Sequence, residues 1–290
     1  MSLKIKHLSK SFGTTESLKN VSLTFEPQTI YGLLGRNGAG KSTLMSILNN
    51  RIIPNDNSET KVTLDDEPLL ENDKQLSRLF LMSEVNLYPN NMRVKTIFKW
   101  TERFFGDFDW DLAQRMTDHF NLNTKKRLQS LSTGYRTIAK IIIALCTPSD
   151  YVFLDEPVLG MDAANRKLFY SFIIEAYEKR PRTFVISTHI IDEIASLIET
   201  AIVINNGEII SQIDIDELQM KGKVVSGPQE DATIYTANLN VIGADYLGGS
   251  ADIYTIGDLP KPVPANLTVS GMTLQNYFVQ LTTRDTDKLN

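Results

Sequence analysis

The first part of the chain combines alternating and continuous apolar segments. Apolar and polar positions alternate over residues 21–25, and residues 29–34 form a continuous apolar run. Alternation predicts a half-buried strand and a short apolar run predicts a buried one, so we predict strands over 3–8 and 21–34. After a glycine-rich turn, apolar residues recur every three to four positions over residues 41–50, which predicts a helix.

Helical periodicity dominates from about residue 85 to 147. One helix is expected around residues 94–101, a second after Asp109, and a third from Gly134 to Cys146. Asp109 is a suitable N-cap, because its side chain can accept hydrogen bonds from the first free amides of a helix. These helices form an insert within a larger domain.

Strands and helices alternate again after the insert. The expected elements are a strand at 151–154, a helix at 163–179, a strand at 183–188, a helix at 190–198 and a strand at 201–205. Such alternation predicts an α/β domain with a mostly parallel sheet and helices on both faces. We therefore predict a domain over residues 1–220, with a β-rich N-terminal part and a helical insert at about 85–147.

The pattern changes after residue 223. Short β-rich segments and several prolines precede one closing helix, expected at residues 273–282. We predict a small accessory α+β domain over residues 221–290.

Composition narrows the class of protein. Hydrophobic residues make up 42% and charged residues 22% of the 290 residues, which are ordinary globular proportions. The net charge of −5 disfavours nucleic acid as a main partner, and the single cysteine, Cys146, excludes a disulfide scaffold. No run approaches the ~18 apolar residues of a membrane span, and the N-terminus lacks the pattern of a signal peptide. We expect a cytoplasmic chain whose membrane span, if it has one, comes from other chains.

Residues 35–43 fit the pattern G-x-x-x-x-G-K-[ST] between an apolar strand and a helix. Glycines let backbone amides converge on a phosphate, and the following helix directs its positive end to the same place. Lys41 can reach the β- and γ-phosphates, and the Ser42 hydroxyl can ligate Mg²⁺. The residues expected to bind nucleotide are Gly35, Asn37, Gly38, Ala39, Gly40, Lys41, Ser42 and Thr43.

A second element is the apolar strand that ends in Asp155 and Glu156. Ligands of open α/β sheets bind at the carboxyl ends of the strands. Asp155 is expected to hold Mg²⁺, and Glu156 to polarise an attacking water as a general base.

Between these elements lies Leu131-Ser132-Thr133-Gly134-Tyr135, at the start of a helix. With the phosphate loop and the acidic strand, it resembles the signature of the ATP-binding-cassette (ABC) ATPases, usually L-S-G-G-Q, over about residues 3–218. The resemblance implies a P-loop NTPase fold, and it implies that Ser132 and Gly134 contact the γ-phosphate of a nucleotide held by an opposite subunit. Thr133 and Tyr135 depart from the family pattern.

Further matches follow at the family's spacing. Gly160-Met161-Asp162 looks like the D-loop, which places Asp162 at a dimer interface. His189 looks like the switch histidine, which contacts the γ-phosphate and holds Glu156 in place. Phe12 stands where the family stacks adenine on an aromatic ring.

One family residue is missing from the segment after the strand that ends near Met82. The family has a glutamine there that reaches Mg²⁺, whereas this chain has Ser83 and Glu84. Glu84, or Ser83 by a shift of one residue, takes its place. Glu84 can ligate Mg²⁺, but without the metal its charge would repel the γ-phosphate.

The resemblance implies an ATPase that binds ATP and Mg²⁺, with Lys41, Glu156 and His189 as catalytic residues and with Ser42, Asp155 and Glu84 at the metal. It implies a homodimer, or a heterodimer with a related ATPase, that drives an integral membrane permease from the cytoplasmic face of the membrane. The single cassette, the segment at residues 87–90 and the C-terminal extension look most like ATPase subunits of bacterial export-type ABC transporters. Within that group, the variant at residues 132–135 resembles subunits of small antibiotic- or peptide-related exporters. No nucleic acid is expected as a partner.

Two other classes of function remain open at this point. One is an ABC-type ATPase that acts on nucleic acid or ribosomes; against it stand the net charge, the single cassette and the lack of zinc-binding cysteines. The other is a GTPase or small-molecule kinase, which would lack an explanation for Ser132-Thr133-Gly134 and would need a guanine-reading Asn-Lys-x-Asp segment that is absent.

Overall fold

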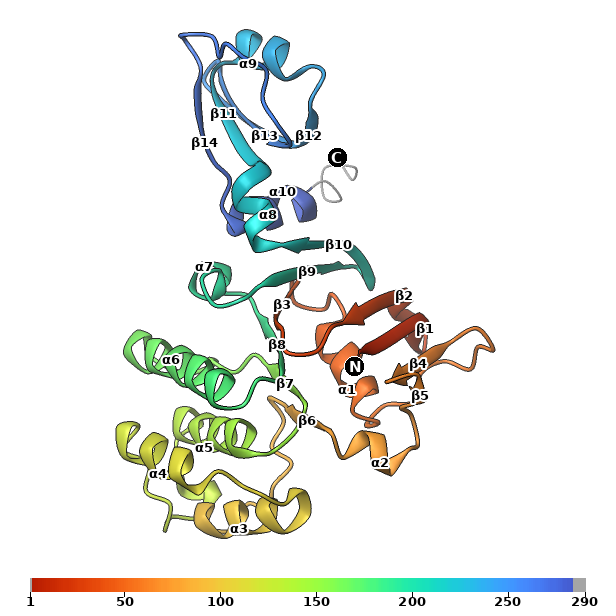
Figure 1. The fold of residues 1–290 in the computed structure, drawn as a ribbon, viewed down its shortest axis with the longest axis vertical. Helices are drawn as coiled ribbons and strands as arrows, with labels where there is room; N and C mark the ends of the chain where they lie inside the picture. The colour runs from red at the N-terminus through yellow and green to blue at the C-terminus, as the bar shows by residue number, and fades with distance from the viewer. Residues whose placement is uncertain (1, 284–290) are drawn as a thin grey trace. The chain divides into compact units, whose positions relative to one another are not determined.

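The computed structural model describes residues 2–283, which fall into two compact units (Figure 1). The first unit runs to His189 and also includes Ile204–Ile209, and the second comprises Ile190–Val203 and the chain from Ile210 onward. The second unit therefore begins earlier along the chain than the predicted boundary at residues 220–221. Two strands contribute residues to both units, β9 (Thr200–Asn205) and β10 (Glu208–Asp214).

Four buried parallel strands form the centre of the first unit. They are β3 (Ile30–Leu34), β8 (Thr183–Thr188), β7 (Tyr151–Asp155) and β6 (Leu79–Met82), in that order across the sheet. Each is a run of buried residues, as expected of strands covered on both faces. Leu34 pairs with Thr188, and Asp155 pairs with Ser187. This register brings the segments that follow β3, β7 and β8 to one edge of the sheet.

An antiparallel sheet accounts for the β-rich N-terminal part. Its order is β2-β1-β4-β5, with β1 (Leu3–Phe12), β2 (Thr15–Phe25), β4 (Lys61–Leu64) and β5 (Glu67–Pro68). The strand predicted over 3–8 is longer, because β1 and β2 form a hairpin that turns at Gly13 (φ +58°). The strand predicted over 21–34 is two strands, because the chain turns at Gln28 (φ +53°) between β2 and β3.

The predicted insert contains α3 (Val94–Phe105), α4 (Trp110–His119) and α5 (Thr133–Cys146), which lie together in Figure 1. The Asp109 side chain caps α4 by accepting from the Leu112 amide at 3.0 Å, as predicted. Ten of the fourteen residues of α5 are buried. The unit's other helical segments are α1 (Lys41–Leu48), α2 (Asp73–Leu76), α6 (Ala163–Lys179) and a 3₁₀ turn (Leu128–Ser130).

The second unit contains an antiparallel sheet with the order β12-β13-β11-β14. The sheet and α9 share a core of Val225, Ala232, Ala251, Ile253 and Leu267. The strands are β11 (Gly222–Pro228), β12 (Asn240–Leu247), β13 (Ser250–Ile256) and β14 (Thr268–Gly271). The helices are α7 (Ile191–Ile194), α8 (Ile215–Lys221), α9 (Gln229–Thr236) and α10 (Leu274–Thr283).

The helices of this unit differ in how closely they match the prediction. The closing helix α10 begins and ends one residue later than predicted. The helix predicted over 190–198 is confined to the four residues of α7, whose N-cap has no side-chain hydrogen bond. Over residues 2–283, each helix is too short or too polar to cross a lipid bilayer.

Candidate functional site

The phosphate loop joins β3 to α1, and its backbone packs too closely for side chains at two glycines. A Cβ at Gly35 would lie 2.6 Å from the Ile204 carbonyl oxygen, and one at Gly40 would lie 2.6 Å from the Ser17 carbonyl oxygen. Gly40 also has φ +110°, which side chains rarely tolerate. Glycine is therefore required at both ends of the turn by the packing of this chain.

Lys41 is buried at the first position of α1 and turns back over the loop. Its Nζ donates to the Gly35 carbonyl at 2.7 Å and to the Arg36 carbonyl at 3.4 Å, and it lies 3.8 Å from Oε1 of Glu156. Burial lowers the pKa of Lys41, and the negative charges of Glu156 and Asp155 partly offset this effect. Carbonyls of the phosphate loop therefore hold the Lys41 ammonium, and a bound phosphate would face this same loop.

A cavity of about 220 Å³ opens at the loop. Glu84 and Glu156 line it together with loop residues 37–43 and Ser17. Ser17 was not among the predicted site residues; its hydroxyl lies 2.8 Å from the Thr43 hydroxyl. The structure thus brings the predicted phosphate-binding residues and two of the predicted carboxylates to one place.

One hydroxyl contacts both acidic residues at the end of β7, the side chain of Asp155 and the backbone of Glu156. Ser187 Oγ donates to Asp155 Oδ1 at 2.8 Å and accepts from the Glu156 amide at 3.0 Å. Glu156 itself has φ +45°, a left-handed conformation uncommon for a side chain larger than Asn or Asp. Asp155 is buried, and of the two residues only Glu156 lines the phosphate-loop cavity. Ser187 is a supporting residue that no sequence motif marked as part of the site.

His189 follows β8 and contacts Glu156 directly. Its Nδ1 lies 2.9 Å from Oε2 of Glu156, and the His189 side chain is 55% exposed against 16% for Glu156. An imidazole at this distance can orient a carboxylate while its other nitrogen stays accessible to a ligand.

The structure distinguishes Ser83 from Glu84 at the position of the missing glutamine. Glu84 lines the phosphate-loop cavity and an adjoining cavity of about 150 Å³ that also contains Asp155, whereas Ser83 lines neither. Lys140 holds this segment, because its Nζ donates to the carbonyls of Ser83 at 2.9 Å and Glu84 at 2.7 Å. Burial lowers the pKa of Lys140. In the sequence, a lysine inside the apolar run 138–146 was the sign that Lys140 would be buried and would need a polar partner.

Seven predicted residues do not line the phosphate-loop cavity of their own chain. They are Phe12, Gly35, Ser132, Gly134, Asp155, Asp162 and His189. Ser132 and Asp162 act locally as N-caps, of α5 and α6 respectively. Gly134, in the first turn of α5, lies so close to the loop between β7 and α6 that a Cβ would lie 2.9 Å from the Gly160 carbonyl oxygen. Phe12 is 50% exposed at the end of β1, with the Lys10 ammonium 5.3 Å from its ring centroid.

The donor set fits Mg²⁺ better than a metal held by protein alone. Among the residues described, no three His, Cys, Asp or Glu side chains are grouped as a metal site would require. Mg²⁺ is usually bound through one or two carboxylates, several waters and the phosphates of a substrate. Ser42 and Glu84 on one cavity, with Asp155 on the adjoining cavity, are such a set.

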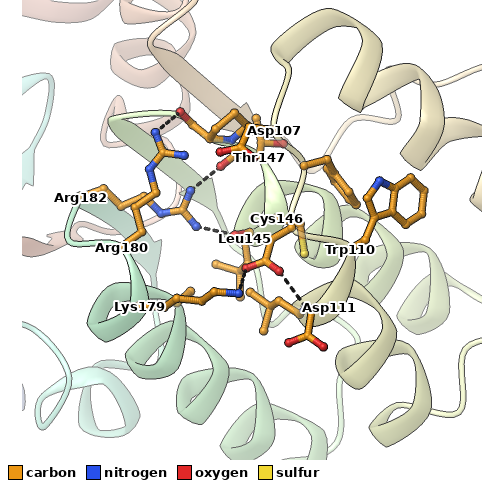
Figure 2. A pocket seen from close by; sticks show the side chains of 14 residues that line it. Asp107, Trp110, Asp111, Leu145, Cys146, Thr147, Lys179, Arg180 and Arg182 are labelled. Atoms are coloured by element: carbon orange, nitrogen blue, oxygen red, sulfur yellow. Dashed lines mark hydrogen bonds and ion pairs between the residues drawn. The ribbon is translucent and has the colours of Figure 1, made fainter.

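A larger cavity, of about 530 Å³, lies apart from the phosphate loop, among α4, α5 and α6 (Figure 2). Charged side chains that line this cavity form ion pairs and hydrogen bonds with other residues of the chain. Lys179 Nζ lies 2.6 Å from Asp109 Oδ2, and Arg182 donates to the carbonyls of Leu145 and Thr147 at the end of α5. These contacts stabilise helix ends, and none of the predicted site residues lines this cavity.

Comparisons with known proteins find ATP-binding proteins of transporters. Residues 18–159 match the family model described as ABC transporter. The ABC transporter ATP-binding protein YtrB of Bacillus subtilis (strain 168) is 24% identical over 75% of this chain and 73% of its own length. The bacitracin transport ATP-binding protein BcrA of Bacillus licheniformis is 27% identical over 76% of this chain and 72% of its own.

The fold is also that of solved ATP-binding cassettes. One of them, a dimeric cassette in a post-hydrolysis state with ADP and Pi, has a TM-score of 0.63 and 20% identity, and the match covers 73% of this chain and 98% of the solved one. The predicted α/β fold of the P-loop NTPase class is thereby confirmed. Over residues 18–159 this chain matches the ABC transporter family, and the relatives and the solved structure it resembles are ATP-binding proteins or cassettes of such transporters.

Proposed function

We propose that the chain is the ATP-hydrolysing subunit of an ABC exporter, working with a separate membrane subunit. The observation that carries the proposal is the convergence of the phosphate loop, Lys41, Glu84 and Glu156 on one cavity. A volume of about 220 Å³ suits the phosphates of a nucleotide better than the whole molecule. The adenine would then lie outside the cavity, against the exposed ring of Phe12.

Binding of ATP rests on the loop. Its backbone amides and the positive end of α1 face the β- and γ-phosphates, and the Lys41 ammonium exchanges its loop carbonyls for phosphate oxygens. Ser42, Asp155 and Glu84 would hold Mg²⁺, which supplies charge neutralisation between the phosphates.

Hydrolysis rests on Glu156. Its carboxylate takes a proton from a water whose oxygen bonds to the γ-phosphorus, while the bond from that phosphorus to the ADP oxygen breaks. His189 orients Glu156 through the 2.9 Å contact. Lys41 stabilises the charge on the transferring phosphoryl group.

A second copy, or a related cassette, would complete the site. Ser132, Gly134 and Asp162 lie off the chain's own phosphate-loop cavity, which supports their action on a nucleotide held by a partner subunit. Dimerisation would couple nucleotide binding to movement of an integral membrane permease at the cytoplasmic face of the membrane. The bacitracin transport relative supports an antibiotic- or peptide-related cargo, which the permease would select.

Two measurements test this function. Purified protein is expected to release phosphate from ATP only when Mg²⁺ is present. In cells, the fraction of the chain that sediments with membranes is expected to be high when its membrane subunit is expressed and to fall when the subunit is deleted. Stimulation of the ATPase by ribosomes or DNA, with no dependence on a membrane subunit, would instead support the nucleic-acid alternative.

Glu84→Gln is expected to strengthen ATP binding about tenfold when Mg²⁺ is removed with a chelator, because a carboxylate facing the phosphates is replaced by a neutral amide. With Mg²⁺ present the gain should shrink, since the carboxylate then faces a cation. Equilibrium binding of a fluorescent ATP analogue measures both conditions. Glu67→Gln, an exposed acid on β5, is the matched control. Equal Mg²⁺-free affinities of Glu84→Gln and the parent would show that Glu84 does not face the phosphates.

A further inference from the structure

Seven exposed basic side chains gather on the helical part of the first unit, although the chain as a whole carries a net charge of −5. Four belong to α3 and its N-cap, and three belong to the segment that precedes the 3₁₀ turn. They are Arg93, Lys95, Lys99, Arg103, Lys125, Lys126 and Arg127. We call this set the basic face.

Backbone hydrogen bonds hold the two parts of the basic face together. The Val94 amide donates to the Lys126 carbonyl at 3.1 Å, and the Lys95 amide donates to the Thr124 carbonyl at 3.0 Å. Arg93 and Arg127 form an antiparallel bridge. Two basic segments about 30 residues apart in the sequence are therefore joined through their backbones where α3 begins.

The chain does not neutralise this surface. Within residues 2–283, none of the seven side chains forms an ion pair. The one acid between residues 93 and 105, Glu102, instead accepts a hydrogen bond from Trp110 Nε1 at 2.7 Å. The N-terminal end of α3 adds its own positive partial charge. Like charges held together in this way favour binding of an external anionic surface.

Exposed aromatic rings run beside the cations on α3. Lys95, Lys99 and Arg103 are spaced by four residues and form one stripe, and Trp100 and Phe104 form the neighbouring one. The two rings are stacked 5.8 Å apart, Phe104 is 77% exposed, and Arg103 lies over the Trp100 ring at 5.2 Å. Rings of this kind beside Lys and Arg are typical of surfaces that meet lipid headgroups.

We propose that the basic face binds the anionic surface of a lipid bilayer. The proposal rests on the proposed function only in placing the chain beside a membrane. The cations would meet lipid phosphates while Trp100 and Phe104 enter the headgroup layer. An acidic protein would pair with the cations but would leave the Phe104 ring exposed to water. A lipid bilayer would accept both, so the aromatic stripe favours lipid as the partner.

Flotation of the purified full-length chain with lipid vesicles, without any other protein, tests the proposal. Binding is expected to vesicles that contain phosphatidylglycerol and not to vesicles of phosphatidylcholine alone, and it should weaken as salt is raised. The triple variant Lys95→Gln, Lys99→Gln, Arg103→Gln should bind phosphatidylglycerol vesicles about 100-fold more weakly. Phe104→Ser should weaken binding without changing its dependence on salt.

A matched triple variant, Lys6→Gln, Lys61→Gln, Lys74→Gln, removes the same charge from exposed positions outside the basic face. It should keep vesicle binding, and an equal loss in both triples would overturn the proposal, since net charge alone would then explain it. Absence of binding by the parent chain would also overturn it. So would a basic-face variant that binds vesicles normally but no longer copurifies with the membrane subunit. ATP turnover of the same preparations shows whether the proposed function stands independently.

Discussion

Glu156→Gln is expected to lower the rate of ATP hydrolysis about 1,000-fold while leaving ATP binding intact. The amide has the shape of the carboxylate and can still contact His189, at the position where the carboxylate oxygen lies 2.9 Å from Nδ1. It cannot, however, take a proton from water. Because ATP would bind without being consumed, the variant should accumulate as an ATP-bound dimer.

Phosphate release under single-turnover conditions measures the chemical step, and size-exclusion chromatography with ATP measures the dimer. The control is Glu178→Gln, which makes the same chemical change on the exposed side of α6 and should hydrolyse ATP at the parent rate. Parent-like turnover by Glu156→Gln would show that another group activates the water.

Arg182→Met is expected to lower the free energy of unfolding by about 3 kcal/mol. Arg182 is 5% exposed and donates to the carbonyls of Leu145 and Thr147, which are left without intrahelical partners where α5 ends (Figure 2). Methionine has a similar length but no donor, so both buried acceptors would lose their hydrogen bonds. The loss is smaller than the two bonds together, because burial of the guanidinium is itself unfavourable and lowers the pKa of Arg182 to about 10.

Denaturant unfolding of the two Arg→Met variants tests this role. Arg180 lies two residues away, is exposed, and donates to the Pro148 carbonyl at 3.0 Å. Arg180→Met should therefore cost less than about 1 kcal/mol. Similar losses for both variants would mean that Arg182 contributes no more than a surface hydrogen bond.

Local chemistry made much of this fold predictable. The strand, glycine turn and helix around the phosphate loop occur as expected, because an apolar run, unhindered glycines and helical periodicity each act over a few residues. The bounds predicted for α6 and β8 match the structure, and Asp109 caps α4. The hairpin of β1 and β2 was underestimated, since residues 15–17 are polar and their strand is defined by pairing rather than by burial.

The supporting contacts of the site could not be predicted in the same way. Ser187 touches Asp155 only because β7 and β8 are neighbours, 32 residues apart in the sequence. Lys140 reaches Ser83 and Glu84 across 57 and 56 residues. A buried lysine or arginine in an apolar segment signals that a partner exists, but the partner's identity depends on the packing of distant elements.

Helix α5 would mechanically connect the two nucleotide sites of the proposed dimer. Ser132 caps its start, and Lys140, about 12 Å further along the axis, grips the backbone of the segment that carries Glu84. With ten residues buried and its far end secured by Arg182, this helix behaves as a stiff rod. The segment that carries Glu84 can therefore move only if α5 moves with it or if the two hydrogen bonds from Lys140 break. In a head-to-tail dimer, α5 would therefore link the nucleotide bound by its own chain, near Glu84, to Ser132, which would face the nucleotide bound by the partner.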